Sequence, residues 1–75
     1  MKVYLVWEEH EGDETLISVC ETEACAEERV KEWNSLYNRG RPLTPGAPAH
    51  SETARWHSGR RAYCIVSQTV ARSQG

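Results

Sequence analysis

Long apolar runs are missing from this 75-residue sequence. The longest is VYLVW at residues 3–7, far short of the ~18 residues that a membrane-spanning helix needs. The chain opens directly on a strand-like pattern, without the apolar segment that a secretory leader would carry. We therefore expect a cytoplasmic protein that does not cross a membrane.

Paired metal-ligand spacings are also missing. Cys20 and Cys25 form one C-x4-C pair across a strand–helix corner, and no second pair follows, whereas structural zinc sites join two close pairs. Three cysteines are an odd number and too few for a disulfide framework. We predict that the chain binds no metal and no other cofactor. The candidate ligands weighed are Cys20, Cys25, Cys64, His10, His50 and His57.

Catalytic motifs are scarce. No Gly-rich phosphate-binding loop occurs, and the carboxylates fall at turn and helix positions that solvent reaches. Cys25 falls in the first turn of a predicted helix, which lowers the pKa of a thiol. The acidic residues around it raise that pKa again: Glu21, Glu23, Glu27 and Glu28. We predict that the protein is not an enzyme and has no catalytic residues.

Acidic and basic side chains are separated along the chain. Residues 1–38 carry ten acidic and three basic side chains, whereas residues 39–75 carry six arginines and one acid, Glu52. Such a division marks either an interaction surface or an attraction between the two halves of one fold.

The elements expected along the chain are strand, strand, helix and strand, in a single domain over residues 1–75. KVYLVWE at residues 2–8 has apolar side chains at both odd and even positions, as in a central strand. TLISVC at residues 15–20 completes a β-hairpin with it. A Pro/Gly-rich loop is expected at about residues 39–52. RRAYCIVSQTVAR at residues 60–72 predicts the last strand, and TARWH at residues 53–57 is either a short edge strand or one helical turn.

The helix is predicted to begin after an N-cap at Thr22 and to end before Gly40. An apolar stripe with helical spacing is expected to pack on the sheet, with Trp33 as its main anchor. The stripe consists of Ala26, Val30, Trp33 and Tyr37.

These elements predict an α+β fold, with an antiparallel sheet in the order 2-1-3 and the helix packed on one face. One helix covers one face only, so the apolar side chains of the other face need a different cover. A homodimer with twofold symmetry supplies it through Tyr4, Val6, Cys64 and Val66. In the alternative, the Pro-rich loop and Trp56 fold back over this face in a monomer.

The segments MKVYLVWEE and LISVCETEACAEERVKEW resemble a family of small bacterial and phage-encoded proteins of unknown function. The shared pattern is a strand that begins K-V-Y, an acidic turn, a strand that ends in a polar cap and an E-x-A-rich helix. The resemblance covers residues 1–37. It implies a ββαβ fold and no known activity or site.

Protein binding is the function that the pattern favours. An acidic helix face, an uncovered sheet face and three tryptophans suit an accessory or inhibitor protein, one that acts on a host protein if the chain is phage-encoded. The alternative is a nucleic-acid-binding accessory protein that uses the Arg/Trp segment at residues 55–61. The residues expected to contact a partner are Glu27, Glu28, Glu32, Arg55, Trp56, Arg60 and Arg61.

Overall fold

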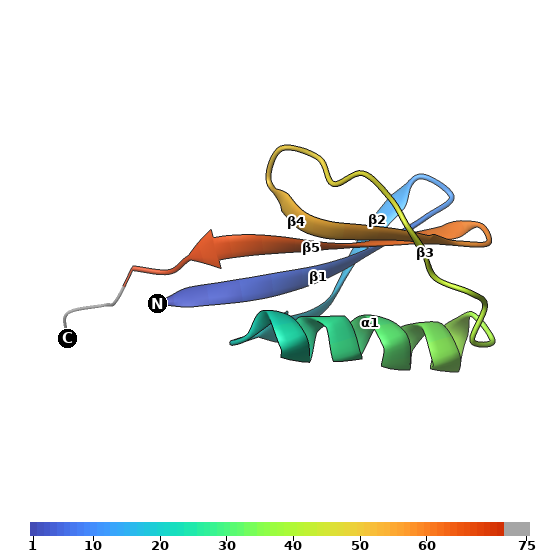
Figure 1. Ribbon diagram of the computed structural model, residues 1–75, viewed down its shortest axis with the longest axis horizontal. Helices are drawn as coiled ribbons and strands as arrows, with labels where there is room; N and C mark the ends of the chain where they lie inside the picture. The colour runs from blue at the N-terminus through green and yellow to red at the C-terminus, as the bar shows by residue number, and fades with distance from the viewer. Residues whose placement is uncertain (72–75) are drawn as a thin grey trace.

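An antiparallel five-stranded sheet with one helix along one side makes up the fold (Figure 1). A computed structural model describes residues 1–71 of the chain. The strand order is β2-β1-β5-β4-β3. The elements are β1 (Lys2–His10), β2 (Asp13–Cys20), α1 (Glu23–Tyr37), β3 (Thr44–Pro45), β4 (Glu52–Ser58) and β5 (Arg61–Thr69).

Two tight turns organise the sheet. Glu11 and Gly12 join β1 to β2, and both have positive φ angles, 52° and 85°. Positive φ at both central residues is the pattern of a type I′ turn, whose twist suits a two-residue hairpin. Gly59 begins the turn from β4 to β5 with a φ of 63°. The two hairpins join into one sheet because β1 and β5 pair antiparallel.

The α+β class is correct, but the expected three-stranded sheet in the order 2-1-3 is wrong. Residues 53–57, for which the sequence allows a strand or a helical turn, lie within β4 and pair with β5. The expected loop at residues 39–52 contains β3, which adds a fifth strand at the edge. A proline is compatible with β3 because an edge strand does not use every backbone N–H in the ladder.

Both ends of α1 are capped by local hydrogen bonds. Thr22 is the N-cap, as expected, and its Oγ1 accepts from the Cys25 N–H at 3.1 Å. At the other end, the backbone N–H groups of Asn38 and Gly40 both donate to the Asn34 carbonyl. Such bonds satisfy backbone groups that have no partner within the helix itself.

The helix packs on the sheet through a stripe that is partly polar. Its buried side chains are Ala26, Val30 and Asn34, at successive intervals of four residues. Trp33 lies half-buried beside this stripe, and Tyr37 is 55% exposed. The expected stripe is therefore correct at Ala26 and Val30 and wrong at Tyr37. Trp33 contributes from the margin of the interface and is not its centre.

Register places alternate residues of β1 on opposite faces. Val6 lies opposite Ile65 of β5, and both are fully buried in the core cluster that also contains Val30 of α1. Because successive residues of a strand point to opposite faces, Leu5 and Trp7 lie on the face away from α1. We call this face, opposite α1, the open face.

The four residues expected at a dimer interface are divided between these faces. Val6 is buried in the core and Tyr4 packs against it, on the helix side. Cys64 and Val66 lie opposite Trp7 and Leu5 respectively, on the open face. The four side chains therefore do not form one surface. Trp56 packs against the core on the helix side, so it does not cover the open face in the way that the monomer alternative requires.

Candidate functional site

The open face carries apolar side chains in cross-strand rows. Leu16 and Val19, both on β2, are 45% and 56% exposed, and their neighbours on β1 are half-buried. Cross-strand neighbours on one face pack against each other. The rows are Leu16, Trp7 and Cys64, and beside them Val19, Leu5 and Val66.

A β-bulge brings the two exposed residues onto this face. Trp7 pairs with Leu16, but Val6 pairs with Ser18, so Ile17 is an extra residue in β2. An extra residue shifts the alternation by one position. Leu16 and Val19, which simple alternation places on opposite faces, therefore lie on the same face.

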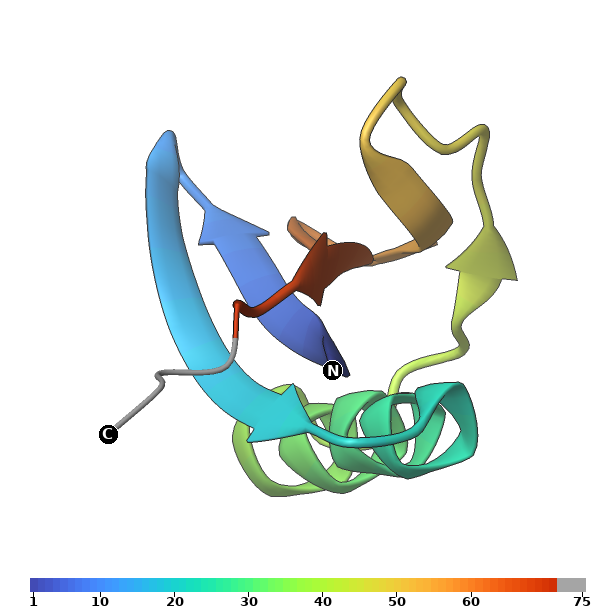
Figure 2. The ribbon, with the colours of Figure 1, turned by 90° about the vertical axis from the view of Figure 1, so that its left-hand side faces the viewer.

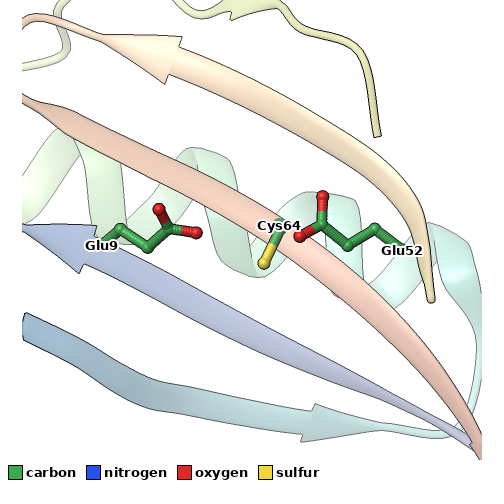
Figure 3. Close-up of side chains that lie close together, drawn as sticks. All are labelled: Glu9, Glu52 and Cys64. Carbon is green, nitrogen blue, oxygen red and sulfur yellow. The ribbon is translucent and has the colours of Figure 1, made fainter. Parts of the chain in front are cut away.

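An arginine holds two carboxylates together beside this apolar area. Arg55 Nη2 lies 2.7 Å from Glu9 Oε2 and 2.6 Å from Glu52 Oε2. The side chain of Glu52 is only 9% exposed. Figure 3 shows the two carboxylates on either side of the Cys64 thiol, with α1 behind the strands. The cluster joins β1, β4 and β5 on the open face.

The cluster lowers the pKa of one of its members and raises the pKa of another. The Arg55 guanidinium lowers the pKa of Glu52 from 4.5 to about 2, which keeps that carboxyl ionised. Burial, and then the charge of Glu52, raise the pKa of the Cys64 thiol to about 12. Glu52 is therefore a carboxylate at neutral pH, and Cys64 is a neutral thiol.

These three side chains also have the spacing of a metal site, because single ligand atoms of Glu9, Glu52 and Cys64 lie within 4.8 Å of one another. Their chemistry opposes metal binding. Arg55 already bridges both carboxylates, and metal ligation needs a thiolate at Cys64, whose pKa is about 12. A divalent ion would have to displace both the guanidinium and the thiol proton.

A polar depression of about 690 Å³ lies where the two hairpin turns meet. The hairpin of β1 and β2 contributes acidic side chains to it, and the hairpin of β4 and β5 contributes basic ones. Its charged and imidazole side chains are Glu9, His10, Glu11, Asp13, Glu14, Arg55, His57, Arg60 and Arg61.

The residues expected to contact a partner are scattered. Arg55 is committed to the carboxylate cluster, and Trp56 packs against the core on the other side of the sheet. Arg61 Nη1 lies 2.7 Å from Glu8 Oε2, whereas Arg60 is exposed. On α1, Glu32 pairs with Arg29, Glu27 is half-buried and Glu28 is exposed. Residues 55–61 thus do not form one continuous surface.

The side of the sheet that faces α1 contains a buried polar network that the sequence reading missed. Asn34 Oδ1 accepts hydrogen bonds from Asn38 Nδ2, Ser58 Oγ and Tyr63 Oη, at 2.8, 3.0 and 3.2 Å. Asn34 Nδ2 donates to the Arg41 carbonyl at 2.7 Å. Among the described residues, every buried side-chain nitrogen and oxygen has a hydrogen-bond partner. The network therefore fastens the end of α1 to β4 and β5.

A buried glutamate extends this polar region. Glu8 is 6% exposed, and its Oε2 accepts from Trp33 Nε1 and from Arg61 Nη1, both at 2.7 Å. A buried carboxylate requires such partners. The pairing explains why Trp33 sits at the margin of the interface, where its indole N–H can reach Glu8.

The three cysteines should differ in reactivity. Cys20 and Cys64 are buried, whereas Cys25 is partly exposed with a thiol pKa raised by its hydrogen bond to Cys20 and then by burial. We expect a thiol reagent at pH 8 to label Cys25 slowly and the other two only after unfolding, because thiolates react and buried thiols are inaccessible. Mass spectrometry of the labelled peptides measures this. Rapid labelling of Cys64 in the folded protein would contradict the buried cluster.

Comparisons with protein-family models, with curated proteins and with solved structures yield no match to this chain. Within residues 1–71, no helix has both the length and the apolar character that crossing a bilayer requires.

Proposed function

We propose that the chain is a small, non-catalytic protein-binding module, of the accessory or inhibitor kind, that contacts its partner through the open face. The observation that carries this proposal is the exposure of Leu16 and Val19, next to Leu5 and Trp7, on the face that α1 does not cover. Adjacent exposed apolar side chains on a small domain are typical of a surface that binds another protein. Tryptophan is frequent among the anchors of such surfaces.

The ionisable groups support a role without catalysis. Arg55 forms ion pairs with both Glu9 and Glu52, and Glu8 accepts hydrogen bonds from an arginine and a tryptophan. The Cys64 thiol, with a pKa of about 12, is not a nucleophile at neutral pH. These groups are committed to partners within the fold, whereas catalytic groups have to be available to a substrate.

Nucleic-acid binding through residues 55–61 has less support. It needs arginines and Trp56 on one surface, but Arg55 and Arg61 are paired with glutamates and Trp56 packs on the helix side.

We place the site of action in the cytoplasm, which is the host cytoplasm if the chain is phage-encoded.

Affinity capture from the cells that make the protein tests the proposal. We expect wild-type protein to retain a stoichiometric partner protein and Val19→Glu to retain about tenfold less, because a charge replaces an exposed apolar contact on the open face. Leu36→Glu is the matched control, since Leu36 is 75% exposed on α1 and away from the sheet. This variant should capture as much partner as the wild type.

Two outcomes would contradict the proposal. One is equal capture by the Val19→Glu and Leu36→Glu variants. The other is a captured complex that nuclease treatment dissolves and that weakens steeply with salt, as phosphate contacts do.

A further inference from the structure

The outer edge of β2 has no strand paired with it among residues 1–71. β2 pairs with β1 alone, and in Figure 2 it forms the left-hand edge of the sheet, with no described helix or strand beyond it. An edge strand presents N–H and C=O groups that can pair with a further strand. Residues 13–16 are exposed at every position, so a partner can reach this half of β2.

The charge of the chain segment that forms this edge has one sign, although at its turn end Arg60 and Arg61 line the same depression as Glu11, Asp13 and Glu14. No Lys, Arg or His occurs between residues 11 and 28. Among residues 1–71, no Lys or Arg forms an ion pair with the acidic side chains of β2 and its two flanks. These acidic residues are Glu11, Asp13, Glu14, Glu21 and Glu23.

This charge disfavours a second copy of the chain as the occupant. Antiparallel pairing of β2 with β2 of another copy brings Asp13 and Glu14 of one chain near Cys20 and Glu21 of the other. The acidic Asp13 and Glu14 of each chain then lie near Glu21 of the other, with no Lys or Arg of β2 between them, and like charges on paired strands are destabilising. A segment with lysines or arginines meets the same acids favourably.

The side chains of β2 indicate which side chains a bound segment should carry. A strand added beside β2 sends every second side chain to the open face, where it meets Leu16 and Val19. Those side chains should be apolar, and the basic ones should alternate with them. The bulge at Ile17 interrupts the ladder, so the paired segment is short.

We propose that the outer edge of β2 binds an extended, basic segment of a partner protein, which adds a sixth strand to the sheet. Backbone hydrogen bonds give affinity in this mode of recognition, and alternate side chains give specificity. The inference rests on the proposed function and deepens it, because it names the chemistry of the partner.

A synthetic eight-residue peptide that alternates lysine with valine is the probe. Titrated into isotope-labelled protein, it should shift the backbone amide signals of residues 13–20 and slow their hydrogen exchange. The same peptide with glutamate in place of lysine should not bind. Raising the salt from low to high concentration should weaken binding, since screening shortens the reach of the charges.

Matched variants distinguish binding at the edge of β2 from a general attraction of the basic peptide to an acidic protein. Asp13→Lys should weaken peptide binding about tenfold, because Asp13 lies on the face to which the lysines point, whereas Glu28→Lys, a charge reversal at an exposed position on α1, should change it by less than about twofold. A peptide N-methylated at alternate residues loses backbone donors, and it should fail to bind. Equal binding of the N-methylated peptide, or equal effects of the two variants, would overturn strand addition.

Failure of this inference can be told apart from failure of the proposed function. If no lysine–valine peptide binds but capture of a partner still depends on Val19, the edge proposal alone is wrong. If that dependence is also lost, both proposals are wrong. A third outcome is a mass of twice 8.5 kDa for the free protein, together with β2 amides that are protected from hydrogen exchange. It would show that a second copy of the chain pairs with the edge, and it would overturn the proposal of a basic partner.

Discussion

Replacing Arg55 with methionine is expected to destabilise the fold by about 3 kcal/mol at pH 7, because it leaves the nearly buried carboxylate of Glu52 without its cation. Arg55 is the hydrogen-bond donor to both Glu9 and Glu52, and Glu52 is nearly buried. Urea denaturation measures the loss. Arg29→Met is the matched control, because it breaks another i,i+3 pair, with Glu32, in which both side chains are about half exposed. Such a pair contributes about 0.5 kcal/mol.

The loss should depend on pH in a defined direction. Arg55 lowers the pKa of Glu52 from 4.5 to about 2. A carboxyl with a lowered pKa in the folded state stabilises the fold above its unfolded pKa, and this contribution is lost as the pH falls to the folded value. The stability difference between wild type and Arg55→Met should therefore be full above pH 4.5 and shrink towards pH 2. A difference that stays constant over this range would contradict the assigned pairing.

Asn34→Ala is expected to cost about 3 kcal/mol, since it removes a buried acceptor of three hydrogen bonds and leaves the Tyr63 hydroxyl without its partner. In a domain of this size, a loss of that magnitude lowers the melting temperature by roughly 15 °C. Thermal unfolding followed by circular dichroism measures it.

Ser35→Ala is the control for this substitution. Ser35 is exposed on the same turn of α1, so its replacement gains similar helix propensity without touching the network. We expect its midpoint to stay within a few degrees of wild type. A midpoint for Asn34→Ala that matches that of Ser35→Ala would show that the network does not hold α1 to the sheet.

Local signals in the sequence were sufficient for much of the helix and the first hairpin. Thr22 caps α1 as predicted, and Ala26 and Val30 are buried. Gly12 lies in the first turn. The sequence allows either a strand or a helical turn at residues 53–57, because five residues that include Arg55 and His57 have no clear period. Their strand conformation comes from pairing with β5, which is a tertiary effect that local sequence does not contain.

The faces of the sheet could not be assigned for a related reason. β1 is apolar at both parities, so alternation alone does not say whether Val6 or Leu5 faces α1. In β2, the bulge at Ile17 reverses the alternation midway. A bulge has no simple sequence signal here, and it moves Leu16 to the face of Val19. Without that extra residue, Leu16 and Val19 would lie on opposite faces and could not both belong to the candidate site.

The buried polar groups were missed because they resemble surface residues in sequence. Asn34, Asn38 and Glu8 are ordinary solvent-facing types. Each is buried because the fold supplies its partners from distant segments: Ser58 and Tyr63 to the asparagines, and Arg61 to the glutamate.

Ion pairs within the fold explain part of the separation of charge along the chain. Two of the six arginines of the second half pair with glutamates of β1, Arg55 with Glu9 and Arg61 with Glu8. These pairs are the attraction between the two halves of one fold, which is one of the two interpretations that the separation of charge allows. The acids around β2 form no ion pair with a Lys or Arg of the described residues, and together with the open edge of β2 they support the proposal of a basic ligand.

Site-specific photocrosslinking in the cells that make the protein tests the central claim most directly. A photoreactive amino acid would replace Val19 on the open face in one variant and Leu36 on α1 in the other, both at exposed positions. Protein binding through the open face predicts a discrete adduct with one protein from position 19 and none from position 36. The absence of an adduct at position 19, or the same adducts from both positions, would contradict it.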